Sequence, residues 1–148
     1  EPWLLRVLGS LGRAVATADG GVLWDQLADE DRDESIRELH AEVADAGGVV
    51  VGRNGTVILA DLPTALHVKV DGPVEDRIAH VCATLGVDEH VARSRQARED
   101  AVRAEMSLRL MGWDPRHNDR FDLVVNTTQL SHDQAVALIV AAQRLKSA

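Results

Sequence analysis

The chain has 148 residues, of which 45% are hydrophobic and 27% are charged, and this balance predicts one soluble globular domain. Its formal net charge of -8 disfavours long nucleic acids as partners, because such binding depends on Lys and Arg side chains that neutralise phosphates. The apolar runs fall well short of the roughly 20 residues that span a bilayer, so no membrane association is expected. Cys82 is the single cysteine, which excludes an internal disulfide and favours a reducing, cytoplasmic location.

The first third of the chain predicts two helices and a strand. Apolar residues recur at helical spacing from Leu4 to Val15 and again from Asp33 to Ala46, and a glycine pair ends each pattern. The β-branched run from Val49 to Val51 then predicts a short buried strand that ends at Gly52.

Strands and helices alternate along the rest of the chain. The expected elements are a strand over 65–70, a helix over 74–85, an arginine-rich helix over 89–110, a strand over 121–126 and a last helix after 131. Asp88 and Ser131 are expected to cap the two helices that follow them, because a short side-chain acceptor satisfies an unpaired backbone N–H. The alternation predicts an α/β protein with three layers, in which the three strands are parallel neighbours and almost wholly buried between helices.

A Gly52-Arg53 pair follows the first predicted strand. At the carboxyl end of a parallel strand, a guanidinium lies at the rim where open α/β sheets bind ligands. Arginine can hold a phosphate through two parallel hydrogen bonds, although an isolated Gly-Arg pair is also typical of a surface salt bridge.

The arginine-rich helix carries a second group of candidate residues. Asp100 and Arg103 are three residues apart and share one helical face. The stretch from Arg93 to Arg120 is rich in arginine, so a local anion site can exist within this acidic protein. The alternative is a solvated helix with internal ion pairs, such as Arg95 with Glu99, and both interpretations stay open here. Further along, Trp113 is expected to be an anchoring, packed indole.

Several blocks, in the same order, resemble the cytidylate-kinase-like family. They are the strand and Gly-Arg loop over 49–63, the strand over 66–70, the segment 73–77 and the segment 122–131. The resemblance covers roughly residues 47 to 145. It implies a fold like that of P-loop nucleoside-monophosphate kinases, formed by the whole chain as one domain with an arginine-rich helical lid over about 87–120.

The resemblance also implies a reaction, in which the γ-phosphoryl group of ATP passes to a nucleoside monophosphate such as CMP and Mg²⁺ bridges the donor phosphates. Val51 stands where the family usually has an acidic residue. The residues that the resemblance assigns to substrate binding are Arg53, Asn54, Arg95, Asp100 and Arg109, and those assigned to catalysis are Arg98 and Arg103.

The chain has no Gly-x-x-x-x-Gly-Lys-Ser/Thr motif, so the sequence offers no recognisable grip for ATP or its metal. We therefore expect that the family's N-terminal strand and phosphate loop lie outside this sequence. The six histidines lack zinc spacing, and no metal site is expected. A second function stays open: a non-catalytic nucleotide-sensing or protein-interaction domain derived from such a kinase, or a domain completed by another chain, including a homo-oligomer.

We expect the 148-residue chain to turn over well below about 1 per second, the slow end of the kinase range. Positioning of well-oriented reactants contributes roughly 7–11 kcal/mol, and the motif that positions the donor is not recognised. A coupled ADP-release assay with ATP, Mg²⁺ and a panel of nucleoside monophosphates measures this, with a longer native chain for comparison. Turnover of about 1 per second or faster from the 148 residues would contradict the expectation.

Overall fold

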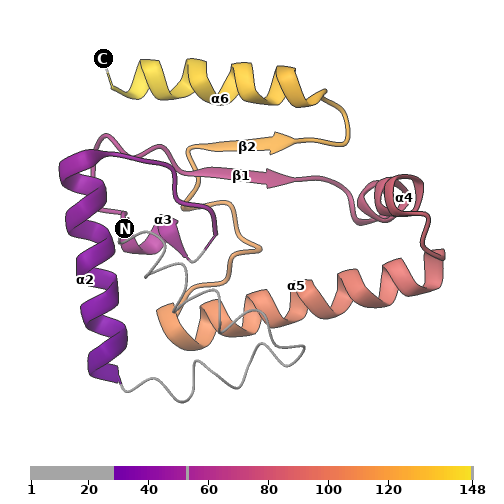
Figure 1. The fold of residues 1–148 in the computed structure, drawn as a ribbon, viewed down its shortest axis with the longest axis horizontal. Coiled ribbons are helices and arrows are strands. Elements are labelled where there is room, and N and C mark those ends of the chain that lie inside the picture. Colours follow the sequence, from indigo (N-terminus) through magenta and orange to yellow (C-terminus); the bar gives the residue numbers. More distant parts are fainter. Residues whose placement is uncertain (1–28, 53, 148) are drawn as a thin grey trace. The chain divides into compact units, whose positions relative to one another are not determined.

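The computed structural model of the chain describes residues 29–52 and 54–147 (Figure 1). The chain divides into two compact units, Glu1–Arg53 and Asn54–Ala148, which are described here one at a time. The helix predicted from Leu4 to Val15 lies outside the described residues, and so does Arg53.

The first unit contains helix α2, Asp29–Ala46, which confirms the helix predicted from Asp33. It ends at Gly47, which has a left-handed φ of 67° and donates its N–H to the Val43 carbonyl at 3.0 Å. Such a conformation suits glycine, which has no Cβ to clash.

The strand expected over residues 49–51 is wrong. These residues are neither helix nor strand, and Val49 and Val51 are 87% and 83% exposed. The β-branched composition indicated a strand, but a strand also needs a neighbour for its backbone N–H and C=O groups. No such pairing to this segment occurs within the described residues.

The second unit contains a parallel sheet of two strands, β1 (Val68–Asp71) and β2 (Leu123–Asn126). The register pairs Val68 with Leu123 at one end and Asp71 with Asn126 at the other. The predicted α/β class and the parallel pairing of these two segments are therefore confirmed, while the described sheet has two strands instead of the three expected.

Burial of the sheet is incomplete and differs between the two strands. Val125 of β2 is only 2% exposed, whereas Val70 of β1, which pairs with it and lies on the same face, is 60% exposed. Val124, the neighbour of Val125 in β2, is 43% exposed. Successive side chains of a strand point to opposite faces, so one face of β2 is covered and the other is open. The expectation that the strands are almost wholly buried between two helical layers is wrong for the described residues.

Four helices complete the second unit: α3 (Gly55–Ile58), α4 (Val74–Leu85), α5 (Glu89–Met111) and α6 (His132–Lys146). The short α3 was not predicted, and the other three confirm the sequence patterns. The predicted caps are also confirmed, because Asp88 accepts from the His90 N–H at 2.8 Å and Ser131 accepts from the Gln134 N–H at 3.2 Å. None of the helices in the described ranges is both long enough and apolar enough to cross a membrane.

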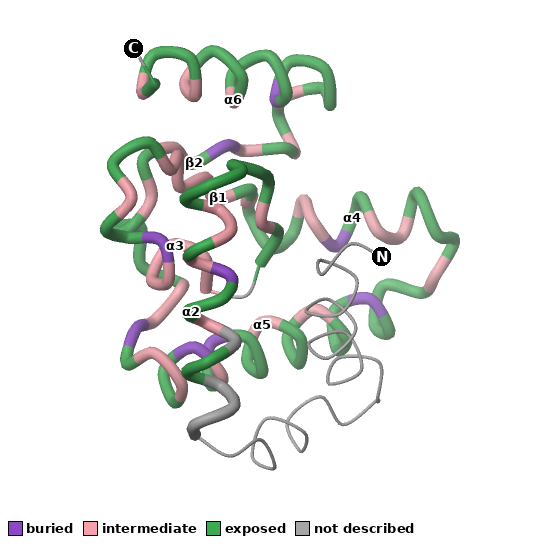
Figure 2. The backbone as a smooth tube through the Cα atoms, turned by 60° about the vertical axis from the view of Figure 1, so that its left-hand side comes forward, coloured by how far each residue is buried: buried purple, intermediate pink, exposed green. Residues whose placement is uncertain are grey.

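Helices α4 and α5 pack against each other across a three-residue connection, and α6 packs along β2. Ile78 of α4 and Ala92 and Ala104 of α5 are buried, and Figure 2 shows buried positions on both helices. Gly86 follows α4 with a left-handed φ of 65°, which ends the helix at the residue that the sequence indicated.

The segment between α5 and β2 is held by an anchored tryptophan. Trp113 is buried, and its ring lies 5.6 Å from that of Phe121. The buried Ser107 hydroxyl donates to the Trp113 carbonyl at 2.7 Å, and Lys69 of β1 donates to Asn118 at 3.0 Å. The predicted packing role of Trp113 is confirmed, and these contacts bring the end of α5 back to the sheet.

We expect Gly72→Ala to destabilise the protein by about 1–3 kcal/mol, because an added Cβ would lie 2.6 Å from Thr128 Cγ2 and would overpack the site. Urea unfolding measures the change. Combining it with Thr128→Ser removes that methyl group, keeps the hydroxyl and should recover part of the loss. An unchanged unfolding midpoint for Gly72→Ala would contradict this account.

Candidate functional site

The carboxyl edge of the sheet is the first part of the site. β1 and β2 end side by side at Asp71 and Asn126. The Thr128 hydroxyl lies 2.7 Å from Asn126 Oδ1 and 3.2 Å from Asp76 Oδ2, and can donate to either. These contacts tie the loop after β2 to the first turn of α4. Open α/β sheets bind their ligands at this edge, outside the carboxyl ends of the strands.

A cluster of four polar side chains lies between α4 and α5. We call it the Asp100 cluster, and its members are Arg77 of α4 and Gln96, Asp100 and Arg103 of α5. Arg77 donates from Nη2 to Asp100 Oδ2 at 2.9 Å and from Nη1 to Oδ1 at 3.4 Å. Asp100 Oδ1 also accepts from Gln96 at 3.1 Å and from Arg103 Nη1 at 2.8 Å. One carboxylate therefore serves three donor side chains.

The cluster keeps its charges. Burial alone would raise the pKa of Asp100 and is the largest single influence, but the hydrogen bonds from Arg77, Gln96 and Arg103 together hold this pKa below its ordinary value. The hydrogen bond to Asp100 raises the pKa of Arg77 despite partial burial, and the nearby charge of Asp71 adds to the rise. Asp100 is therefore ionised at neutral pH beside two cations.

The Asp100 cluster adjoins the carboxyl edge. Arg77 directly follows Asp76, whose carboxylate meets Thr128, and the electrostatic influence of Asp71 on Arg77 comes from the end of β1. The Arg77 side chain is 26% exposed and that of Arg103 is 62% exposed. Arg103 consequently has the more exposed arginine side chain of the cluster.

Of the residues proposed from the sequence, Asp100 and Arg103 are the two that the structure brings together. Arg95 instead donates from Nε to Glu99 at 2.7 Å, which confirms the ion pair considered as the alternative. Arg98 and Arg109 are exposed on α5. At roughly 100° of turn per residue, Arg95, Arg98 and Arg109 all project from the side of α5 opposite Asp100.

The structure describes Asn54 of the Gly-Arg segment but not Arg53. Arg53 lies outside the described residues, so its position relative to the sheet stays a prediction. Asn54 has a left-handed backbone, with φ 57°, and its carbonyl accepts the N–H groups of Val57 and Ile58 at the start of α3. This conformation is several-fold more common for Asn than for most residues, which accounts for its place at the turn into α3.

Sequence reasoning missed Arg77 and Gln96 as site residues. Arg77 precedes the buried Ile78 of α4, so its side chain leaves the helix beside the packed face. An arginine near a buried face usually has a carboxylate partner, so the position of Arg77 in the helical pattern could have predicted that it forms an ion pair. The partner itself lies 23 positions away on another helix, beyond the reach of local patterns.

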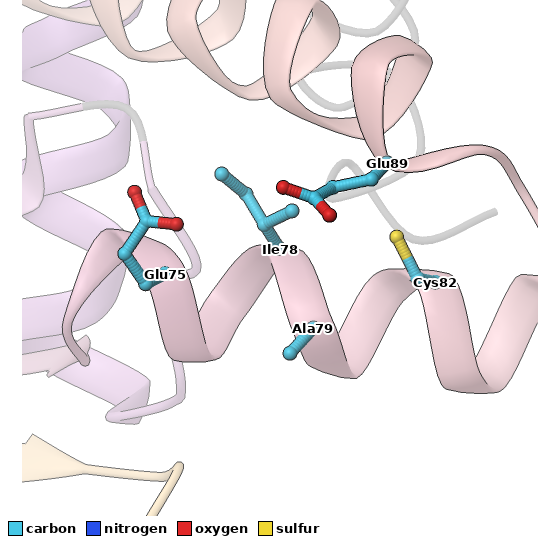
Figure 3. Close-up of a pocket in the computed structure, with 5 residues that line it drawn as sticks. All are labelled: Glu75, Ile78, Ala79, Cys82 and Glu89. Atoms are coloured by element: carbon cyan, nitrogen blue, oxygen red, sulfur yellow. The ribbon is translucent and has the colours of Figure 1, made fainter.

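A hollow lies at the contact between α4 and the start of α5. It has a volume of about 300 Å³ and is lined by Glu75, Ile78, Ala79, Cys82 and Glu89, which Figure 3 shows projecting from α4 and from the start of α5. Arg93 bonds both carboxylates, at 2.7 Å to each oxygen of Glu75 and at 2.9 Å to Glu89. Two acidic residues with one arginine leave this hollow poorly suited to phosphate.

The acidic and histidine side chains of the described ranges do not form a metal cluster. No group of three His, Cys, Asp or Glu side chains gathers there in a way that could hold a metal ion. The acidic side chains nearest the sheet are already engaged, since Asp71 accepts from Gly72 at 2.8 Å and Asp76 contacts Thr128.

The parallel sheet of two strands and the helices that surround it are compatible with an α/β domain. Residues 5–129 match the family model described as the cytidylate kinase-like family. The match spans well over half of the chain, so the protein belongs to this family, and the resemblance inferred from the sequence is confirmed.

One curated relative is a Corynebacterium glutamicum protein named uronate isomerase. The two are 36% identical over 107 residues, which make up 72% of this chain and 20% of that protein. The chain therefore spans about a fifth of the length of this relative. No solved structure matches the chain significantly.

We expect Asp100→Asn to lower the free energy of unfolding by about 1–3 kcal/mol at pH 7, because it removes the charge that three donors share. The pKa of Asp100 is lower in the folded state than in the unfolded state. Its contribution to the free energy of unfolding is therefore complete above the unfolded-state pKa of about 3.9 and is lost as the pH falls through the folded-state pKa. The difference between the two proteins should therefore shrink below about pH 4.

Urea unfolding at several pH values from 7 down to 3 measures this difference. Glu105→Gln, at an exposed position within α5, is the control for loss of one carboxylate. A deficit for Asp100→Asn that is equally large at pH 3 and pH 7 would show that the ion pairs do not cause it.

Proposed function

We propose that this domain binds nucleotides and transfers a phosphoryl group from ATP to a nucleoside monophosphate such as CMP. The observation that carries the proposal is the Asp100–Arg103 pair of the Asp100 cluster. It presents an arginine side chain that is 62% exposed and is held at one nitrogen by a carboxylate, in a chain that belongs to the cytidylate kinase-like family.

Phosphoryl transfer needs positioning and charge stabilisation more than covalent help from the protein. In this proposal Arg103 donates to the phosphate oxygens on which negative charge accumulates. Asp100 orients Arg103, since its Oδ1 already accepts from three nitrogens and has little capacity left for a ligand. A carboxylate placed in this way fixes the guanidinium before the ligand binds, which reduces the cost of ordering it.

The other proposed residues have more distant support. Arg53 would hold the acceptor phosphate and Asn54 would set the turn beside it, as the family resemblance implies. Arg98 projects from the opposite side of α5, together with Arg95 and Arg109. These three residues would contact a nucleotide only if the nucleotide also reached that side of the helix. ATP would be the donor, and Mg²⁺ bound mainly by the phosphates would neutralise part of their charge.

A second candidate function is nucleotide sensing without transfer. The observation that favours it is the match to about one fifth of a protein named uronate isomerase. A domain similar to this chain therefore forms part of a protein whose name refers to isomerisation and not to phosphoryl transfer. In that case nucleotide binding at the same edge would regulate a partner domain. Binding of nucleotides without ADP release would favour this candidate over the kinase.

Isothermal titration with a panel of nucleoside monophosphates tests the proposal. Arg103→Ala should weaken binding about tenfold to a hundredfold, because a hydrogen bond to a charged group contributes roughly 1.5–3 kcal/mol. Arg53→Ala should weaken it similarly. Arg144→Ala, on the exposed side of α6, removes the same charge away from the site and should leave binding unchanged.

The results separate the alternatives. Binding by Arg103→Ala as tight as by the unmodified chain would contradict the assigned contact. An unmodified chain that binds no nucleoside monophosphate at millimolar concentration would reject both the kinase and the sensing function at this site.

A further inference from the structure

We propose that Arg77 is a positioning residue that holds Asp100 from the neighbouring helix and thereby keeps the charge of Arg103 available to an anionic ligand. The inference rests on the proposed function, because it concerns the same nucleotide site. Neither the family match nor the sequence patterns assign a role to Arg77. Three features of the Asp100 cluster support it, and each is independent of the identity of the nucleotide.

The first feature is the origin of the contacts to Asp100. Gln96 and Arg103 belong to α5 itself and can only fix Asp100 relative to its own helix. Among the described residues that bond this carboxylate, Arg77 is the one that comes from another element. Its two hydrogen bonds, at 2.9 and 3.4 Å, therefore set Asp100 relative to α4 and to the edge of the sheet from which α4 starts.

The second feature is the charge of the cluster. Asp100 lies between two arginines, so the three groups together carry one net positive charge. Without Arg77, Asp100 and Arg103 would neutralise each other, and Arg103 would be drawn into a closer pair with its only remaining counter-ion in the cluster. A phosphate would then have to compete with Asp100 for the guanidinium, which weakens binding.

The third feature is burial. The Arg77 Nε atom is buried and has no hydrogen-bond partner among the described residues, while the Nη atoms carry the bonds to Asp100. Leaving one buried N–H unsatisfied costs free energy. The side chain nevertheless reaches inward to Asp100 instead of turning to solvent, which indicates that the two bonds to the carboxylate determine its conformation.

A nearby ion pair provides a matched control. Arg93 of α5 donates to both oxygens of Glu75 of α4 at 2.7 Å, so it also bridges the two helices with a bidentate contact. It does not touch Asp100. If Arg77 mattered only by holding α4 against α5, Arg93→Ala should reproduce the effect of Arg77→Ala on ligand binding.

The experiment is a double-mutant cycle on the 148-residue chain, with CMP as the titrated ligand and thermal unfolding followed in parallel. Arg77→Ala should weaken CMP binding about tenfold, whereas Arg93→Ala should change it less than about twofold. In an Asp100→Ala background, Arg77→Ala should have little further effect, because the residue acts through Asp100. Arg77→Lys keeps the charge but not the bidentate geometry, so its affinity for CMP should lie between those of the unmodified chain and Arg77→Ala.

Each outcome decides the matter. Unchanged CMP binding in Arg77→Ala overturns this inference but leaves the proposed function standing. Losses of affinity that simply add in the Arg77→Ala, Asp100→Ala double variant also overturn it, because additivity would mean that Arg77 contacts the ligand directly. If Arg77→Ala does not fold, Arg77→Lys decides: binding as tight as in the unmodified chain overturns the inference, and a loss of about threefold or more supports it. An unmodified chain that binds neither CMP nor another nucleoside monophosphate rejects the proposed function and this inference together.

Discussion

The parallel pairing of β1 with β2 is the constraint on which the arrangement of the second unit depends. Two parallel neighbours end at the same edge, so the chain must return from Asp71 to the start of β2 by a long connection. Helices α4 and α5 form that connection, and the Trp113 segment closes it. The register then sets Asp71 beside Asn126, and α4 leaves the edge with Asp76 within reach of Thr128. Arg77 follows at once, which places the Asp100 cluster at this edge.

The opposite edge of the sheet is held by separate contacts. Asp122 Oδ2 accepts from the His67 N–H at 2.7 Å and from Lys146 Nζ at 2.6 Å, so one carboxylate joins the starts of both strands to the end of α6. Burial lowers the pKa of His67, which favours its neutral form at this position. The Lys146–Asp122 ion pair therefore lies at the amino edge of the sheet, whereas the Arg77–Asp100 pair belongs to the cluster that adjoins the carboxyl edge.

Local chemistry made much of this fold predictable. Gly86, Asp88 and Ser131 mark helix ends through backbone conformation and capping, and the structure places all three as the sequence indicated. The closeness of Asp100 and Arg103 also followed from helical spacing alone. The strand over residues 49–51 failed, because strand formation depends on a pairing partner that composition does not specify. The Arg77–Asp100 contact depends on how two helices cross, and no local pattern contains that information.

The two ion pairs between α4 and α5 have a mechanical consequence. Together with the three-residue connection, Arg77–Asp100 and Arg93–Glu75 fasten the helices near both ends of their contact. Moving α5 by itself would break both pairs, whereas rotating the two helices as one rigid body would break neither. Any displacement of α5 relative to α4 would therefore separate Asp100 from Arg77, so the geometry of the Asp100 cluster is tied to the packing of these two helices.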